Sequence, residues 1–165
     1  MRISLLAWGS RGDVEPFVAL ARGLAQAGRD VRVLAALDYR DLVERAGVAF
    51  TPFPISMDAA IHSPAGRAWL AGSRGSPWRE AVAMRRLAAE FAPSAAVGMR
   101  SAGTTDTLIS GTLTFPAAVA LAAHTGQPHV LAQLMPLTPS AHLHANQVAP
   151  TERPSRINRA LGEFA

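Results

Sequence analysis

The residues best suited to chemistry form a short loop, 9–13 (Gly-Ser-Arg-Gly-Asp), which directly follows an apolar run over 2–8. Two glycines three positions apart allow a tight turn and close approach of a ligand, and the start of a following helix presents N–H groups that attract phosphate. The spacing is G-x-x-G and no G-K-[ST] follows, so the loop matches neither the dinucleotide fingerprint nor a Walker A loop. By spacing alone it is a weak indication of a phosphate site.

Asp13 has two interpretations. At the junction of loop and helix, its carboxylate would stabilise the helix N-terminus by about 1 kcal/mol. Alternatively it is a general base aimed into a cleft, which requires hydrogen-bonding reach to a substrate hydroxyl. Residue types alone favour the helix-stabilising interpretation and leave the second open.

Further candidates flank the expected cleft. The segment 111–115 follows the fourth expected strand and supplies hydroxyl groups and an aromatic ring. For Thr114 a helix N-cap is favoured, with substrate contact as the alternative. Trp69 and Trp78 flank a long Pro-, Ser- and Gly-rich stretch. Their side chains either line a hydrophobic pocket or pack within this stretch, and the sequence does not decide between the two roles.

Other polar residues are weaker candidates. His142 and His144 lie two residues apart with no third ligand near in sequence, so solvated or substrate-lining histidines are favoured over a metal site. Asp38 stands where a dinucleotide fold has its ribose-binding acid, but the glycine pattern is broken and a helix cap is favoured. We expect no metal and no cofactor.

Composition narrows the class of protein. The 165 residues carry a net charge of only +4, and all 16 basic residues are arginines scattered along the chain, which argues against a nucleic-acid track despite the sequence pI of 11.2. A hydrophobic content of 49% is enough for a core, and the absence of cysteine excludes disulfides and thiolate metal sites. No apolar run approaches the roughly 20 residues of a membrane span, and we expect a cytoplasmic protein.

Alternating strand and helix patterns place these residues. Strands are expected over 2–8, 30–36, 48–53, 106–110 and 129–134. Between them we expect a turn at 9–14, a helix from Pro16 that Gly28 ends, a helix from Asp38 that Gly47 ends, a helix over 77–92 and a helix over 115–125 that Gly126 ends. The stretch 54–76 is expected to be an irregular surface excursion, 94–102 is helical or irregular, 135–154 is a loop, and Ser155 begins a final helix.

These repeated units predict an α/β fold with a doubly wound parallel sheet, Rossmann-like, in a single domain over 1–165. In such a sheet ligands bind at the carboxyl ends of the strands near the topological switch point. The loops after the first, fourth and fifth strands are therefore the expected place for chemistry.

The segments 9–21, 31–35, 46–48, 126–128 and 134–139, together with Gly28 and Phe53, resemble the opening half of GT-B glycosyltransferases of the sterol glucosyltransferase and glycopeptide- or macrolide-antibiotic type. The resemblance is weak over 54–105. Where plant and drug-metabolising relatives carry a histidine as the base, this sequence has Asp13, as in the sterol and antibiotic branch. Leu137 departs from the tryptophan common in sterol enzymes, which puts a sterol acceptor in doubt.

The resemblance implies an inverting, metal-independent transfer in which Asp13 removes the proton of an acceptor hydroxyl that attacks the sugar of a nucleoside diphosphate donor. It implies that Ser10, Arg11 and Gly12 border the diphosphate. The residues expected to contact a lipophilic acceptor (a sterol, polyketide or glycolipid) are Trp69, Trp78, Thr112, Phe115, Met135 and Thr138.

The sequence thus predicts the N-terminal, acceptor-binding half of a two-domain hexosyltransferase that uses a UDP- or TDP-sugar. The domain is expected to be truncated at its C-terminal end and to lack the donor-binding half, so the isolated chain is expected to be inactive. Two alternatives stay open. One is an auxiliary binding domain that needs a separate donor-binding subunit, and the other is a Rossmann-type nucleotide-binding oxidoreductase.

Overall fold

The computed structural model describes residues 1–70, 77–102, 105–134 and 156. The strands are β1 (Arg2–Leu6), β2 (Asp30–Ala36), β3 (Ala49–Phe53), β4 (Thr107–Ser110) and β5 (His129–Leu131). The helices are α1 (Arg11–Gln26), α2 (Arg40–Arg45), α3 (Met57–His62), α4 (Pro64–Leu70), α5 (Pro77–Ala102) and α6 (Phe115–Thr125), with single 3₁₀ turns η1 (Leu37–Tyr39) and η2 (Thr112–Thr114). All of them belong to one compact unit, Met1–Ala132, and a second unit spans Gln133–Ala165.

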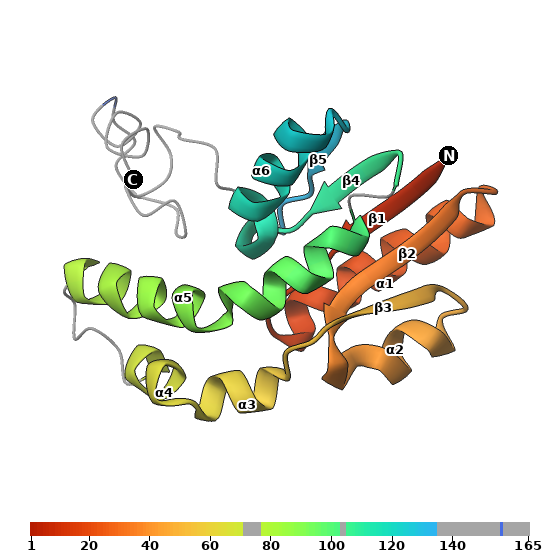
Figure 1. Cartoon of the computed structure of the whole chain (residues 1–165). Coiled ribbons are helices and arrows are strands. Elements are labelled where there is room, and N and C mark those ends of the chain that lie inside the picture. Colours follow the sequence, from red (N-terminus) through yellow and green to blue (C-terminus); the bar gives the residue numbers. More distant parts are fainter. Residues whose placement is uncertain (71–76, 103–104, 135–155, 157–165) are drawn as a thin grey trace. The chain divides into compact units, whose positions relative to one another are not determined.

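The strands form a parallel sheet in the order β3-β2-β1-β4-β5, with Leu5 aligned to Val33 on one side and to Ile109 on the other. The chain builds outward from β1 to β3, then returns to place β4 on the opposite side of β1 (Figure 1). This reversal confirms the predicted doubly wound α/β fold. It makes the carboxyl ends of β1 and β4 the topological switch point.

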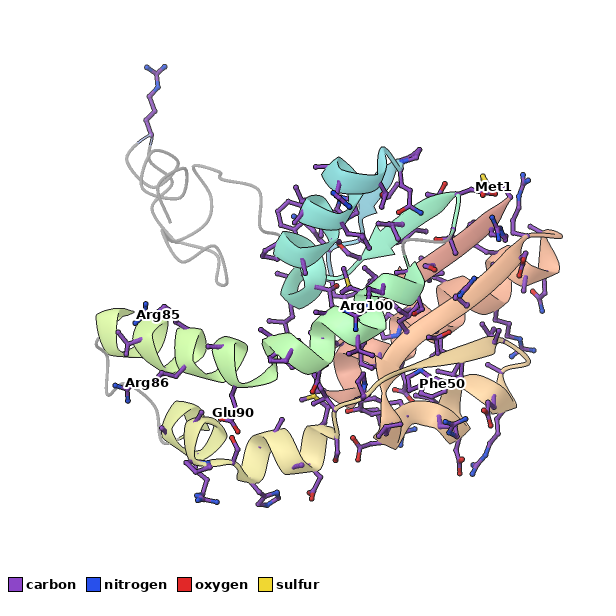
Figure 2. All side chains as sticks on the ribbon, viewed as in Figure 1. Met1, Phe50, Arg85, Arg86, Glu90 and Arg100 are labelled. Carbon is purple, nitrogen blue, oxygen red and sulfur yellow. The ribbon has the colours of Figure 1, made fainter. Side chains whose placement is uncertain are left out.

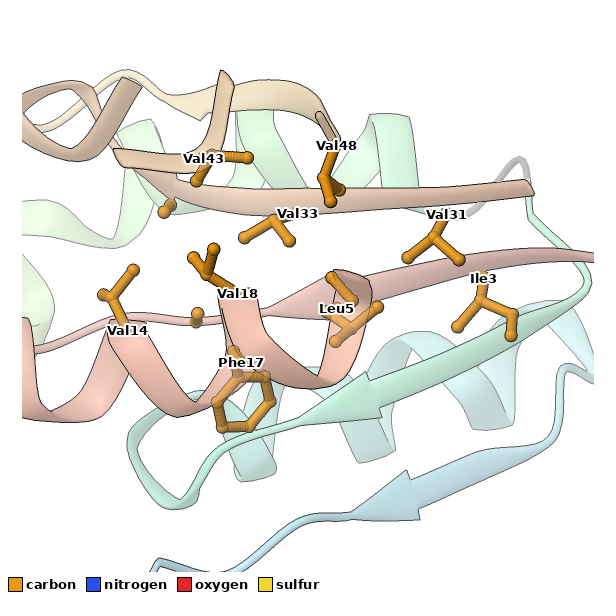
Figure 3. Close-up of a cluster of buried hydrophobic side chains, with 12 residues drawn as sticks. Ile3, Leu5, Val14, Phe17, Val18, Val31, Val33, Val43 and Val48 are labelled. Atoms are coloured by element: carbon orange, nitrogen blue, oxygen red, sulfur yellow. The ribbon is translucent and has the colours of Figure 1, made fainter. Parts of the chain in front are cut away.

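Helices cover both faces of the sheet because β1 is apolar on both of its faces. Leu5 belongs to the cluster that α1 and α2 cover, where Phe17 and Val33 are buried (Figure 3). Leu6 faces the other way, into the cluster that α5 and α6 cover with Met99 and Ala118. Each large apolar side chain buried in this way contributes about 1.5–3 kcal/mol.

The structure corrects two expectations about helices and decides a third that was left open. α1 begins at Arg11, inside the predicted turn 9–14, so Pro16 lies within the helix instead of near its start. The irregular excursion expected at 54–76 contains α3 and α4, because Ser56 caps α3 through the Ala59 N–H and Pro64 begins α4. For 94–102, the helical alternative is confirmed, because α5 continues past the expected end at 92 with Pro93 inside the helix.

The expectation that Asp38 caps the helix ended by Gly47 is also wrong. Its carboxylate does not cap α2 but accepts hydrogen bonds from the Ser56 hydroxyl and the Met57 N–H, at 2.9 and 2.6 Å. Asp38 therefore connects the segment after β2 to the start of α3. Its two partners, Ser56 and Met57, lie 18 and 19 positions later in the sequence. The expected ends at Gly28, Gly47 and Gly126 are confirmed by positive φ angles of 75°, 73° and 71°.

The loop 135–154 and the helix after Ser155 lie outside the described residues. Within the part that the structure describes, no helix is both long and apolar enough to cross a membrane.

Candidate functional site

Two loops meet at the switch point. The carbonyl of Leu6, at the end of β1, accepts a hydrogen bond from the Gly111 N–H at 3.1 Å and another from the Thr114 hydroxyl at 2.9 Å. Thr114 does occupy the N-cap position of α6, but its hydroxyl makes no cap bond and joins the loops after β1 and β4 instead. This contact brings together segments 108 positions apart in the sequence.

Asp13 is held against the loop that precedes its helix. Its Oδ2 accepts hydrogen bonds from the N–H and the hydroxyl of Ser10, at 2.7 and 2.8 Å, as the reciprocal half of a capping box. A Cβ atom on Gly9 would lie 2.4 Å from the same oxygen, so only glycine leaves room for the carboxylate. The position of the Asp13 carboxylate thus depends on both Gly9 and Ser10.

This arrangement satisfies the helix-stabilising interpretation of Asp13 and leaves a base role open. Both hydrogen bonds reach Oδ2, and among the described residues no hydrogen bond reaches Oδ1. The side chain is only half-buried. One carboxylate oxygen is therefore anchored while the other has free lone pairs, which is what a positioned base requires.

Tyr39 is a contact of this loop that sequence reasoning missed. Its hydroxyl donates to the Gly9 carbonyl at 3.3 Å from the 3₁₀ turn after β2. Burial, and then the nearby charges of Asp38 and Asp13, raise the pKa of the Tyr39 phenol, which keeps it protonated and able to donate. Nothing in the local pattern of Tyr39 indicates a loop 30 residues earlier.

The three residues expected near a diphosphate open α1. Ser10 is the N-cap, Arg11 and Gly12 are the first two helical residues, and all three are exposed. The first N–H groups of a helix lack intrahelical partners and attract anions. The Arg11 guanidinium is paired with Glu15 at 2.7 Å, and this hydrogen bond raises its pKa.

An apolar cavity of about 590 Å³ lies on the α5/α6 face of the sheet. Among its described lining residues, Trp8 and Thr114 belong to the two loops of the switch point. The remainder are Phe53, Ile55, Ala92, Ala95, Ala96, Met99, Arg100, Leu113, Pro116, Ala117, Ala120 and Leu121. Trp8 precedes Gly9, so the cavity and the Asp13 loop are neighbours along the chain.

The residues expected at an acceptor site fall in different places. Thr112 and Phe115 lie in η2 and at the start of α6, and their neighbours Leu113, Thr114 and Pro116, not they themselves, line the cavity. Trp69 and Trp78 are near the end of α4 and the start of α5.

Met135 and Thr138 lie outside the described residues, as do His142 and His144. Sequence reasoning missed the α5 contribution to the cavity, because its alanine-rich stretch carries no pattern that distinguishes a cavity wall from a packed helix face.

A Ser–His contact lies beside this site. The Ser110 hydroxyl at the end of β4 is 2.8 Å from Nε2 of His129, and the His129 ring lies 5.7 Å from that of Phe115. Burial lowers the pKa of His129. Ser110 is fully buried, so the pair links β4 to β5 rather than presenting a nucleophile. Within the described part of the chain, no group of three or more His, Cys, Asp or Glu could hold a metal ion.

Sequence comparison identifies relatives with one kind of activity. Residues 3–111 match the family model described as the glycosyltransferase family 28 N-terminal domain. Over 64 residues the chain is 47% identical to O-mycaminosyltylonolide 6-deoxyallosyltransferase of Streptomyces fradiae, covering 39% of this chain and 15% of that protein. Over 52 residues it is 38% identical to sterol 3-beta-glucosyltransferase of Sclerotinia sclerotiorum, covering 32% of this chain and 4% of that protein. The matches therefore span only a small part of these relatives.

Comparison with solved structures finds glycosyltransferases that share the fold of this chain. The chain resembles a glycosyltransferase of Streptomyces sp. SF2575 solved in complex with thymidine diphosphate, with a TM-score of 0.58 and 21% identity. The match covers 98% of this chain and 42% of that one. At this identity the likeness establishes the shared Rossmann-like architecture of the matched region.

Proposed function

We propose, from the premise that this chain belongs to the glycosyltransferase family 28 N-terminal domain family, that it is the acceptor-binding domain of a nucleotide-sugar-dependent hexosyltransferase. The donor, a UDP- or TDP-sugar, would be bound mainly by a second domain. The solved neighbour of the same fold that holds thymidine diphosphate supports a nucleoside diphosphate donor.

The observation that carries this proposal is the apolar cavity beside the Asp13 loop. Ligands of doubly wound sheets bind at the switch point, and here Trp8 and Thr114 connect that point to a cavity with walls that are mostly hydrocarbon. A volume of about 590 Å³ lies within the range of small-molecule sites. The acceptor is therefore a lipophilic molecule with a hydroxyl group that reaches Asp13.

The proposed reaction is an inverting displacement without a metal ion. Oδ1 of Asp13, which accepts no hydrogen bond from the described residues, takes the proton of the acceptor hydroxyl, and the hydroxyl oxygen forms a bond to the anomeric carbon. The bond from that carbon to the diphosphate breaks, and its electron pair leaves with the nucleoside diphosphate. The exposed N–H groups at the start of α1, around Arg11 and Gly12, stabilise the growing negative charge.

The decisive substitution is Asp13→Asn in the complete enzyme. The amide oxygen of Asn can still accept the Ser10 N–H, so the loop keeps its shape while the base is lost. We expect kcat to fall by about 100- to 10,000-fold with donor affinity unchanged. Asp41→Asn is the control, since Asp41 is an exposed carboxylate paired with Arg45 on α2. Turnover that survives Asp13→Asn would remove Asp13 from the mechanism.

A further inference from the structure

The apolar cavity has two distinct ends. Helix α5 leads into β4 and α6 leads away from it, so both run antiparallel to the strands (Figure 1). Ala92 and Pro116 therefore line the cavity on the side nearer the carboxyl edge of the sheet, and Arg100 lines it further along α5 towards the amino edge. Arg100 lies eight positions after Ala92 in α5, which corresponds to about 12 Å along the helix axis.

Three of the described lining residues carry hydrogen-bond donors in their side chains: Trp8, Arg100 and Thr114. Arg100, on the C-terminal half of α5, is the single charged residue among the described lining residues (Figure 2). No ion pair or hydrogen bond of its guanidinium is found within the described residues. The indole N–H of Trp8, near the Asp13 loop, is buried and also lacks an acceptor there. The Thr114 hydroxyl is already used, since it donates to the carbonyls of Leu6 and Gly111.

We infer that Arg100 selects acceptors that carry a carboxylate at the end remote from the hydroxyl that receives the sugar. This inference rests on the proposed function, which places the reacting hydroxyl at Asp13. A guanidinium binds a carboxylate through two parallel hydrogen bonds, and the hydrocarbon between the two cavity ends fits an apolar skeleton. The acceptor class is therefore an amphiphilic hydroxy acid rather than a neutral sterol.

The expected effect is limited by solvent. A hydrogen-bonded charge pair in a dry site would change affinity by about tenfold to a hundredfold. Because Arg100 is exposed, water and salt screen the pair, and we expect about a tenfold preference for the acid that shrinks as salt is added.

The test compares ω-hydroxylauric acid with its methyl ester, which has the same chain and hydroxyl group but no charge. Their affinities for the complete protein are measured by isothermal titration calorimetry, with no sugar donor present. Arg100→Met keeps the length of the side chain and removes its charge. Arg85→Met is the matched control, because Arg85 is exposed on the N-terminal half of the same helix and does not line the cavity (Figure 2).

The inference is supported if the wild type and Arg85→Met prefer the acid by about tenfold and Arg100→Met binds acid and ester alike. It is overturned if acid and ester bind the wild type equally, if neither binds, or if Arg100→Met keeps the preference. Binding is measured without sugar transfer, so these outcomes are separate from the fate of the proposed reaction, which Asp13→Asn tests.

Discussion

Gly9→Ala adds a single carbon atom, and we expect it to displace the Asp13 carboxylate. Gly9 has a φ of 137°, a backbone conformation that costs a residue with a side chain about 1–3 kcal/mol. The added Cβ would lie 2.4 Å from Asp13 Oδ2 and 2.7 Å from its Cγ, whereas ordinary contacts begin at 3.4 Å. The carboxylate must therefore move by about 1 Å, which would break its hydrogen bonds to Ser10 and cost about 1 kcal/mol of capping energy.

These effects predict that Gly9→Ala lowers the free energy of unfolding by about 2–4 kcal/mol. Urea denaturation followed by circular dichroism measures this value. In the complete enzyme the displaced base should also lower kcat by about a hundredfold, because misplacement of a catalytic group by about 1 Å has an effect of that size.

Gly23→Ala is the matched control. Gly23 also lies in the segment of α1, and a Cβ there would meet nothing within 4 Å, so we expect the helix to gain about 0.5–1 kcal/mol. If Gly9→Ala unfolds at the same urea concentration as the wild type, the close packing of Gly9 against Asp13 is refuted.

Two further predictions concern buried polar groups on β1 and at the β4/β5 contact. Ser4 is fully buried, and its hydroxyl has no partner among the described residues. Ser4→Ala should therefore raise the free energy of unfolding, measured by urea denaturation, by about 1 kcal/mol. A clear loss of stability would show that the hydroxyl is hydrogen-bonded. Burial lowers the pKa of His129 below its ordinary value of 6.5, so the unfolded chain binds more protons than the native chain just below that pH. Stability should therefore be retained above pH 6.5 and fall as the pH drops through 6.5 towards the lowered native pKa, and His129→Gln should weaken this fall. Denaturation of both proteins at several pH values checks it, and identical profiles would contradict it.

Most of the fold could be predicted from local patterns because the strands and helix ends obey local rules. β1 is a buried apolar run, and the positive φ angles at Gly28 and Gly126 end α1 and α6 as expected. The start of α1 was misplaced because Pro16 suggested an early helical position, whereas the capping interaction between Ser10 and Asp13 begins the helix earlier. The helices at 57–70 were missed because they are short and lack an amphipathic period.

The sequence by itself determined the alternation of strands and helices, and with it the doubly wound sheet and the loop that carries Asp13. It also marked Asp13 as either a helix-stabilising carboxylate or a base, since both depend on its place at the helix start. Only the tertiary structure showed that Ser10 anchors Oδ2, that no hydrogen bond from the described residues reaches Oδ1, and that Tyr39 contacts the loop. The cavity was equally beyond local reasoning, because β1, β3, α5 and α6 are brought together by burial of the sheet faces and not by any pattern within one segment.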